Sequence, residues 1–341
     1  MSRQTVLLLF GGQSSEHDIS IMSARNVYAA MDGEKYDVLL GYIDREGKWW
    51  LLDTWTQDLS RHGGHQIAAV PGTRSFMTIP GDKVLPVDVI FPVLHGKNGE
   101  DGTVQGLAAM MHIPIVGCDI EASALCMDKH LTKTILRARG VPVVDWLTST
   151  ASTDRDEIKR KIESRLGTAP WFVKPSRAGS SVGVSKVKSV DELDAAIDTA
   201  LRHDTLVLIE RSVVGRELEV SVLGNPPHHK ASDVGEIIIG AEFYDYDDKY
   251  SAESTSEVQT EIELPGQLRA QIRQIAADAY EIMGCKGLSR VDFLLGPNDA
   301  LYLNEINTMP GFTNISMYPK LWQVQGVRYA ELIDRLIMLA H

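Results

Sequence analysis

The chain contains the stretch Leu288-Ser289-Arg290-Val291-Asp292-Phe293-Leu294-Leu295 and, after a short gap, Leu301-Tyr302-Leu303-Asn304-Glu305-Ile306-Asn307. Each stretch is predicted to form a strand, and Gly296-Pro297-Asn298-Asp299 between them suits a hairpin turn. Side chains alternate across a strand, so Arg290 and Asp292 share one face, as do Glu305 and Asn307. A hairpin would therefore bring two carboxylates, an amide and an arginine together.

Oxygen ligands of this kind suit Mg²⁺ that is held together with substrate phosphates. The alternative is a solvated strand face with scattered charges. Solvated strands usually alternate apolar and polar residues, whereas here the carboxylates cluster after an apolar run. The pattern therefore predicts a metal site at Asp292, Glu305 and Asn307.

The composition is that of an ordinary globular protein. The chain has 341 residues, of which 44% are hydrophobic and 23% charged, and this length suggests two or three domains. A net charge of −12 argues against a general nucleic-acid binder. The three cysteines are odd in number and show no CxxC spacing, which argues against a disulfide framework or a structural zinc site.

The same sequence favours a cytoplasmic protein. The apolar run near the N-terminus is too short for the core of a signal peptide. No apolar stretch approaches the roughly 18 residues that a membrane span needs. We therefore expect a protein of a reducing compartment that binds neither nucleic acid nor membrane.

Residues 1–120 alternate short apolar strands with helices, which predicts an open α/β layer with a parallel sheet. Strands are expected at Val6–Phe10, Val38–Ile43 and Val87–Leu94, and helices at about Glu16–Met31 and at Thr103–Met111. Ligands of such sheets bind beyond the carboxyl ends of the strands. The polar loops Gly11–Asp18 and His95–Gly102 follow two of these strands and are expected to form a shared site.

The character of the sequence changes after residue 120, and we expect α+β units at 121–212 and 213–341. Helices are expected at Ala122–Arg139, Val190–Leu201, 266–283 and Leu321–Leu339, and strands at Trp171–Pro175, Thr205–Glu210 and Arg216–Leu223. The polar segment 243–261 breaks the pattern. A loop of this length inside a compact domain is usually functional or disordered, and a lid is one natural role.

The loop Gly179-Ser180-Ser181-Val182-Gly183 offers backbone N–H groups to an anion. It matches neither a Walker A loop nor G-x-G-x-x-G. Lys174 and Lys129 add point charges for phosphates, and the metal ligands make this role more plausible than snorkelling at the surface. Glu210 is either a surface carboxylate or, with Glu217, an acceptor for a nucleotide amino group or ribose hydroxyl.

In their order along the chain, these motifs resemble the ATP-grasp fold, which holds ATP between two α+β subdomains. The motifs are Asp128-Lys129, Val173-Lys174-Pro175, Gly179–Gly183, Leu208-Ile209-Glu210, Arg290-x-Asp292 and Glu305-x-Asn307. Four further segments, Gly11–Ser20, Leu94–Gly106, Asp245–Tyr250 and Asn307–Thr313, are closely similar to motifs of D-alanine–D-alanine ligases. The motifs run in family order from residue 10 to about residue 319, so the resemblance covers nearly the whole chain.

The resemblance implies an ATP-dependent ligase that joins two D-alanines for peptidoglycan precursors, and so serves cell-wall biogenesis and cell shape. ATP would convert the first D-alanine to D-alanyl phosphate, and the amine of the second would then displace phosphate through a tetrahedral intermediate. Two Mg²⁺ or Mn²⁺ ions and a homodimer are also implied. Residues 1–120 would be a substrate-binding domain, and 121–212 and 213–341 the central and C-terminal ATP-grasp subdomains, the latter with the metal site and the lid.

The resemblance also assigns the substrate side of the site. Glu16 would bind the ammonium of the first D-alanine, and His95 would lie near its carboxylate. Ser180 and Tyr250 would hydrogen-bond with Glu16. The oxyanion hole would consist of Arg290 and the Gly311 backbone N–H, while Ser316, with the Met317 backbone, would hold the carboxylate of the second D-alanine.

On the nucleotide side, Lys129, Lys174 and Lys249 would neutralise the triphosphate, with Ser181 among the ATP-binding residues. Adenine and ribose would be held by Glu210, the Val213 backbone and Glu217. Asp292, Glu305 and Asn307 would hold the two metal ions.

Three alternatives compete with this interpretation. The first is a ligase with another second substrate. Met309 and Met317-Tyr318 depart from the commonest family pattern near that pocket, whereas Tyr250 accompanies D-alanine rather than D-serine or D-lactate. The second is a degenerate nucleotide-binding regulator, against which the complete set of metal ligands, lysines and oxyanion arginine argues. A dinucleotide oxidoreductase, suggested by Gly11-Gly12 alone, lacks G-x-G-x-x-G.

Overall fold

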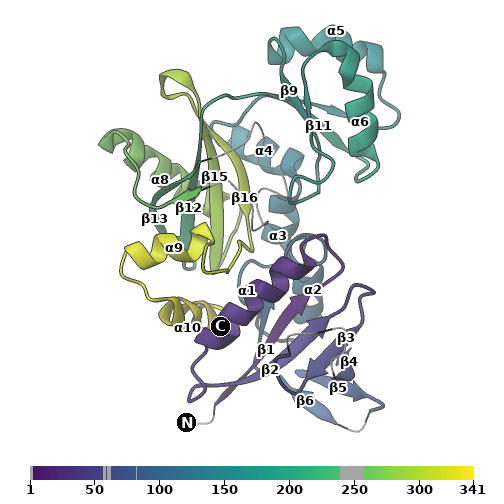
Figure 1. The fold of residues 1–341 in the computed structure, drawn as a ribbon, viewed down its shortest axis with the longest axis vertical. Helices are drawn as coiled ribbons and strands as arrows, with labels where there is room; N and C mark the ends of the chain where they lie inside the picture. The colour runs from purple at the N-terminus through teal and green to yellow at the C-terminus, as the bar shows by residue number, and fades with distance from the viewer. Residues whose placement is uncertain (1–2, 57–58, 60–62, 82, 239–256) are drawn as a thin grey trace.

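The computed structural model describes residues 3–56, 59, 63–81, 83–238 and 257–341. These residues form three sheets, each flanked by helices and arranged as three units along the long axis of the molecule (Figure 1). In this part of the chain no helix is both long enough and apolar enough to cross a membrane.

The N-terminal unit is built on a seven-stranded sheet in the order β6-β5-β4-β3-β2-β1-β7. Its strands are β1 (Gln4–Gly11), β2 (Tyr36–Ile43), β3 (Trp49–Leu52), β4 (His65–Val70), β5 (Ser75–Ile79), β6 (Val84–Pro86) and β7 (Val89–Val93). β1 pairs in parallel with β2 and β7, which confirms the predicted parallel sheet, and β3–β6 extend it by antiparallel pairing. Because β1 and β7 are parallel neighbours, the two polar loops that follow them meet at one edge.

Helices cover both this sheet and its junction with the rest of the molecule. α1 (His17–Ala30) follows β1, and α2 (Thr103–Met110) follows the loop after β7. α1 also packs against α10 (Tyr329–Leu339), the last helix of the chain (Figure 1). The C-terminal end of the chain is thereby joined to the N-terminal unit.

The central and C-terminal units have antiparallel sheets, in the orders β10-β9-β11-β8 and β14-β13-β12-β15-β16. The first contains β8 (Trp146–Ser149), β9 (Trp171–Pro175), β10 (Ser185–Val187) and β11 (Val207–Arg211), with α5 (Arg155–Leu166) and α6 (Leu193–Leu201). The second contains β12 (Arg216–Leu223), β13 (Lys230–Ile238), β14 (Glu257–Gln259), β15 (Leu288–Leu295) and β16 (Leu301–Asn307), with α8 (Gly266–Ile282) and α9 (Met317–Val324).

Two segments that were predicted as single helices are each divided in two. The first forms α3 (Ile120–Met127) and α4 (Lys129–Ala138), which are separated by Asp128 in an extended conformation. The Asp128 carboxylate accepts the N–H groups of His130 and Leu131 and so caps α4. The second forms α9 and α10, with Gly326 between them at a φ of +85°.

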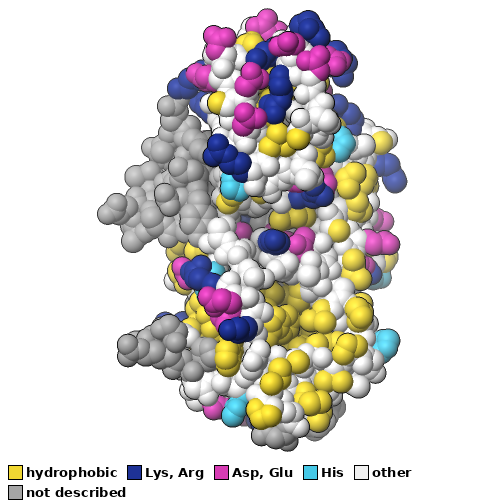
Figure 2. Space-filling model, turned by 90° about the vertical axis from the view of Figure 1, so that its right-hand side faces the viewer, with side chains coloured by type: hydrophobic (Ala, Val, Ile, Leu, Met, Phe, Trp, Pro, Cys, Tyr) yellow, Lys and Arg dark blue, Asp and Glu magenta, His cyan; other side chains and the backbone are white. Residues whose placement is uncertain are grey.

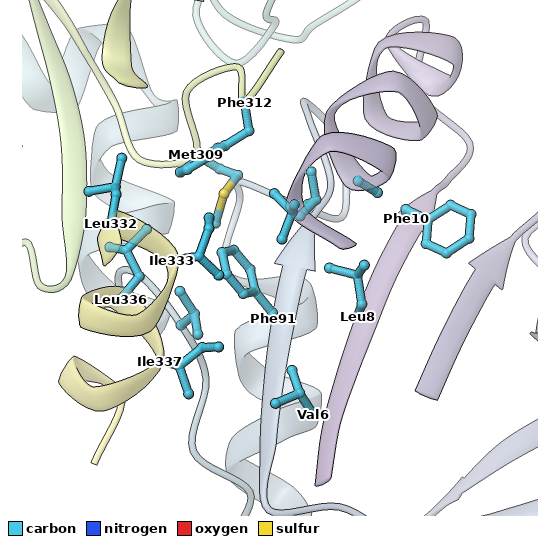
Figure 3. Close-up of a cluster of buried hydrophobic side chains, with 14 of the residues drawn as sticks. Val6, Leu8, Phe10, Phe91, Met309, Phe312, Leu332, Ile333, Leu336 and Ile337 are labelled. Atoms are coloured by element: carbon cyan, nitrogen blue, oxygen red, sulfur yellow. The ribbon is translucent and has the colours of Figure 1, made fainter. Parts of the chain in front are cut away.

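A hydrophobic core joins the N-terminal sheet to the C-terminal helices, as Figure 3 shows. It contains Val6, Leu8 and Phe10 of β1, Phe91 of β7, Met309 and Phe312 of the loop after β16, and Leu332, Ile333, Leu336 and Ile337 of α10. The loop 308–316 is therefore anchored in a core that two units share, and this anchor fixes one wall of the cavity described below.

Phe312 is the side chain whose removal should damage this core most clearly. It is fully buried, and its ring contacts Phe91 edge-on, with 6.2 Å between ring centroids, and Tyr318, with 5.5 Å. We expect Phe312→Ala to lower the free energy of unfolding by about 3–5 kcal/mol, measured by urea denaturation. Val324→Ala, at a site that is 50% exposed, serves as the control and should change it by less than about 0.5 kcal/mol. Equal effects of the two substitutions would contradict the anchoring role.

Candidate active site

A cavity of about 650 Å³ lies where the three units meet. The N-terminal unit contributes Glu16, His95 and Glu100, the segment around α4 and the loop after β9 contribute Lys129, Gly179 and Ser180, and the C-terminal unit contributes Glu217, Glu219, Arg290, Asp292, Glu305, Asn307, Gly311, Ser316 and Met317. Most residues that the sequence singled out therefore line a single space.

The predicted hairpin is confirmed by the pairing of β15 with β16. Asp292 lies opposite Glu305, and Arg290 lies opposite Asn307. Directly paired residues of antiparallel strands project from the same face of the sheet. The two carboxylates, the amide and the arginine therefore share the face that borders the cavity.

Arg290 is held by two carboxylates. Its Nε and Nη2 donate to the two oxygens of Asp292 at 2.7 Å each, and Nε lies 3.1 Å from Glu219 Oε1. Burial alone would lower the pKa of Arg290, but Asp292 and Glu219 raise it well above its usual value. Arg290 is therefore a fixed positive charge at the cavity wall.

The loop Gly179–Gly183, which was predicted to bind an anion and is called the anion-binding loop below, lies next to Lys129. The Lys129 ammonium donates to the carbonyl of Ala178 at 2.8 Å and lies 3.5 Å from Glu305 Oε2. Ser180 and Ser181 both have a positive φ, of 49° and 58°. Backbone strain at non-glycine residues is concentrated at functional loops. The loop therefore combines an unusual backbone conformation with a cation beside it.

A buried charge cluster lies between α4, β9 and β11. Glu210 is paired with Lys133 at 2.8 Å and with Lys174 at 2.6 Å. Burial by itself would raise the pKa of Glu210, yet the two lysines hold it below its usual value. Lys133 is completely buried, and burial lowers its pKa while Glu210 opposes that effect.

Glu16 links the N-terminal loop to the anion-binding loop. It is 8% exposed, and a Cβ atom added at Gly96 or Gly179 would lie 3.0 Å or 3.4 Å from its Oε2. Both glycines thus allow their backbones to approach the carboxylate closely. Gly96 also has a φ of +71°, which side chains rarely adopt.

His95 connects the N-terminal unit to the loop after β16. Its Nδ1 lies 3.0 Å from the Met309 carbonyl and so carries the proton of a donor, while Nε2 lies 3.3 Å from Ser23 Oγ. Ser23 Oγ in turn accepts the Phe312 N–H at 3.3 Å. Burial would lower the pKa of His95, but Glu100 and Glu16 raise it above its usual value.

Two family models match the chain and together span most of it. The model described as D-ala D-ala ligase N-terminus matches residues 5–118, and the model described as D-ala D-ala ligase C-terminus matches residues 135–338. The chain belongs to the D-alanine–D-alanine ligase family. The resemblance that the motifs indicated is confirmed, and the protein is a ligase with the ATP-grasp fold and uses ATP as a substrate.

Individual relatives agree with the family models. The D-alanine–D-alanine ligase A of Chromobacterium violaceum is 45% identical over 352 aligned positions, which cover 100% of this chain and 96% of the relative. The solved D-alanine-D-alanine ligase of Coxiella burnetii superposes with a TM-score of 0.90 at 37% identity, covering 100% of this chain and 94% of that one. The VanG D-Ala:D-Ser ligase of Enterococcus faecalis superposes with a TM-score of 0.89 at 34% identity, and the superposition covers 100% of both chains.

Some residues that the ligase resemblance assigned lie away from the cavity wall. Ser181, Lys174, Glu210 and Val213 do not line this cavity, although Lys174 and Glu210 form the buried cluster with Lys133. Lys249 and Tyr250 lie outside the described residues, as does most of the segment 243–261.

The loop of residues 308–316 and the start of α9 form the far wall of the ligase cavity. A Cβ atom added at Gly311 would lie 2.7 Å from Ser316 Oγ, so the residue stays without a side chain there. The Ser316 hydroxyl also lies 2.7 Å from the Thr313 hydroxyl. Met317 lines the cavity, whereas the side chains of Met309 and Tyr318 belong to the hydrophobic core rather than to the cavity wall.

Lys133, Glu219 and Glu100 were missed as site residues. Lys133 lies one helical turn after Lys129, a spacing that places both lysines on one side of α4. Glu219 alternates with apolar residues on β12 and so looked like part of an ordinary polar strand face. Only the pairing of β12 with β15 reveals that Glu219 lies beside Asp292.

The Lys133–Glu210–Lys174 cluster predicts a pH-dependent stability. Glu210→Gln leaves two lysine charges without their carboxylate, so we expect it to cost about 3–5 kcal/mol of unfolding free energy at pH 7. The pKa of Glu210 is lower in the folded protein than its usual value of 4.5. The ionised carboxylate therefore stabilises the fold fully above pH 4.5, and this stabilisation is lost as the pH falls through the folded-state pKa.

The difference in unfolding free energy between wild type and Glu210→Gln should therefore become smaller when urea denaturation is repeated at successively lower pH below 4.5. The exposed pair Arg335–Glu331 provides the control, since Glu331→Gln should have a small effect at either pH. A Glu210→Gln deficit that stays constant across the pH range would contradict the ionised state of Glu210.

Proposed function

We propose that this ligase joins two D-alanines to D-alanyl-D-alanine for peptidoglycan precursors, with ATP converted to ADP and phosphate. The observation that carries the proposal is the convergence of three units on one cavity. Glu16 and His95 come from the N-terminal loops, Lys129 comes from α4, and Arg290 and Ser316 come from the C-terminal unit. Amino-acid recognition and phosphate recognition thus face the same space.

The reaction needs two displacement steps. A carboxylate oxygen of the first D-alanine attacks the γ-phosphorus of ATP, which forms D-alanyl phosphate and releases ADP. The amine of the second D-alanine then attacks the acyl carbon and forms the C–N bond of a tetrahedral intermediate, which loses the amine proton and collapses with release of phosphate. The intermediate oxygen gains negative charge, and Arg290 with the Gly311 N–H would stabilise it.

The residues present fit a divalent metal site. The donors are the carboxylates of Asp292 and Glu305 and the amide of Asn307, which are oxygen ligands from adjacent strands. Among the described residues, no three His, Cys, Asp or Glu side chains form a metal cluster, so phosphate and water would complete the coordination. Bound Mg²⁺, or Mn²⁺, would neutralise charge on the phosphate oxygens of ATP.

We propose D-alanine as the second substrate as well. The support is the expected match at Tyr250, a residue outside the described part of the chain, together with the close relatives that are named D-alanine–D-alanine ligases. A D-serine acceptor is the competing proposal, because the VanG D-Ala:D-Ser ligase superposes almost as well as the Coxiella burnetii enzyme.

Three further expectations remain predictions: a cytoplasmic location, a lid at 243–261 and a homodimer.

Figure 2 shows charged side chains over the central unit at the top and a broad hydrophobic area on the lower half of this face. On the N-terminal side of the molecule Met110 is 64% exposed. Sedimentation equilibrium over a range of protein concentrations would measure the oligomeric state.

The reaction itself can be tested by phosphate release from ATP and Mg²⁺ on addition of D-alanine, with mass spectrometry of the product. We expect release that depends on D-alanine, a dipeptide of two D-alanines, and no release with L-alanine. Equal mixtures of D-alanine with D-serine or D-lactate measure the choice of second substrate. If the mixed product exceeded D-alanyl-D-alanine, D-serine or D-lactate would be the preferred second substrate and the proposal of D-alanine would be wrong.

Arg290→Lys tests the oxyanion role. Lysine keeps the positive charge but loses the planar fork that binds Asp292 at two points. We expect kcat to fall by about 10²–10³-fold, the typical loss for one oxyanion donor, in a steady-state assay of phosphate release. Arg269→Lys, which changes an arginine–aspartate pair outside the cavity, is the matched control. An unchanged kcat in Arg290→Lys would remove Arg290 from the reaction.

A further inference from the structure

Glu219 belongs to the cavity wall, although no catalytic, substrate-binding or metal-binding role was assigned to it above. It is 8% exposed and lies on β12 directly opposite Asp292 of β15. Asp292 in turn lies opposite Glu305 of β16. Cross-strand partners share a face, so Glu219, Asp292 and Glu305 form a row of carboxylates across three strands.

Arg290 is the cation that this row holds. Asp292 binds it at two points, and Glu219 Oε1 lies 3.1 Å from its Nε. A row of like charges across adjacent strands is unfavourable unless a counter-charge lies among them. Arg290 supplies that charge for Asp292 and Glu219, while Lys129 lies 3.5 Å from Glu305 at the other end.

The two carboxylates that hold Arg290 differ in one respect. Asp292 is a proposed metal donor, whereas Glu219 lies on the strand on the opposite side of β15 from Glu305. A metal ion at Asp292 would compete with Arg290 for the same negative charge, because both are cations. Glu219 would then be the carboxylate that still faces the guanidinium.

The surroundings of Glu219 support a dedicated role. Its partner on β13 is Gly235, which has no side chain and therefore places no charge beside it from that strand. The sulfur of Met317 packs over Gly235, where an added Cβ atom would be too close to it. Glu219 is thereby enclosed on one side by apolar packing, and its carboxylate lies beside Arg290.

We propose that Glu219 is a positioning residue that keeps Arg290 in place for the ligation step while Asp292 serves the metal ion. The proposal rests on the proposed function of Arg290 as an oxyanion donor. Glu219 acts through Arg290 and touches neither reacting carbon nor phosphorus.

Glu219→Gln tests this role with little change of shape, since glutamine keeps the size of the side chain and removes its charge. We expect kcat for phosphate release to fall by about 10–100-fold, as typically follows loss of a partner that orients a site residue. KM for ATP and for D-alanine should stay within about twofold, because the loss falls on the transition state. Glu219→Asp, which restores the charge, should recover part of the activity.

Asp233→Asn is the matched control. Asp233 lies on the same sheet and pairs with Arg269 at 2.7 Å, but it does not line the cavity. It should leave kcat unchanged. Urea denaturation of each variant separates a folding defect from the expected loss of kcat.

Two outcomes would overturn the proposal. Wild-type kcat in Glu219→Gln would show that Arg290 needs no second carboxylate. A Glu219→Gln enzyme that regains full kcat at high Mg²⁺ would show that Glu219 is a metal ligand and not a support for Arg290.

A second measurement does not depend on turnover. The Nε–H signal of Arg290 can be followed by ¹H–¹⁵N NMR in the full-length protein, with Arg290→Lys used to assign it. On addition of Mg²⁺ and a non-hydrolysable ATP analogue we expect a sharp signal in wild type and a broadened one in Glu219→Gln. Equal signals in both proteins would contradict the proposal. Phosphate release by the wild-type enzyme tests the proposed ligase reaction by itself. A failure of that reaction can therefore be distinguished from a failure of the positioning role of Glu219.

Discussion

The geometry of the cavity depends on the packing of Phe312 in the core that the N-terminal and C-terminal units share. This side chain comes from the C-terminal unit, yet it packs against Phe91 of the N-terminal sheet. The Phe312 N–H and the Met309 carbonyl are bound at the same junction, through Ser23 and His95. Packing and hydrogen bonding therefore fix the loop 308–316 relative to the N-terminal sheet, and so fix two walls of the cavity relative to each other.

The electrostatics of the cavity follow from its position between units. Arg290 is paired with carboxylates of its own sheet, whereas Lys129 of α4 is paired with Glu305 of β16. Removing charges from water is costly unless they are paired with good geometry. The Lys129–Glu305 pair offsets part of that cost for both side chains.

The sequence allowed prediction of the parts of the site that short-range rules determine. Strand alternation placed Arg290 with Asp292 and Glu305 with Asn307, the predicted hairpin brought the two pairs together, and the register of β15 with β16 agrees. The break at Asp128 could not be predicted from helical periodicity, because it depends on the carboxylate capping α4 and on a hydrogen bond from Ser176, which is distant in sequence. Helix propensity is a weak signal when such tertiary contacts compete with it.

Lys133 and Glu219 show why the remainder needed the fold. On a strand or helix, a charged residue at a polar position looks the same whether solvent or another element faces it. Lys133 is buried beside Glu210 of β11, and Glu219 is buried beside Arg290 of β15. A buried charge is stable only where partners satisfy it, so each of these residues depends on pairing with residues distant in sequence. Besides the proposed substrate-binding groups, the site thus includes buried charges that are paired with one another.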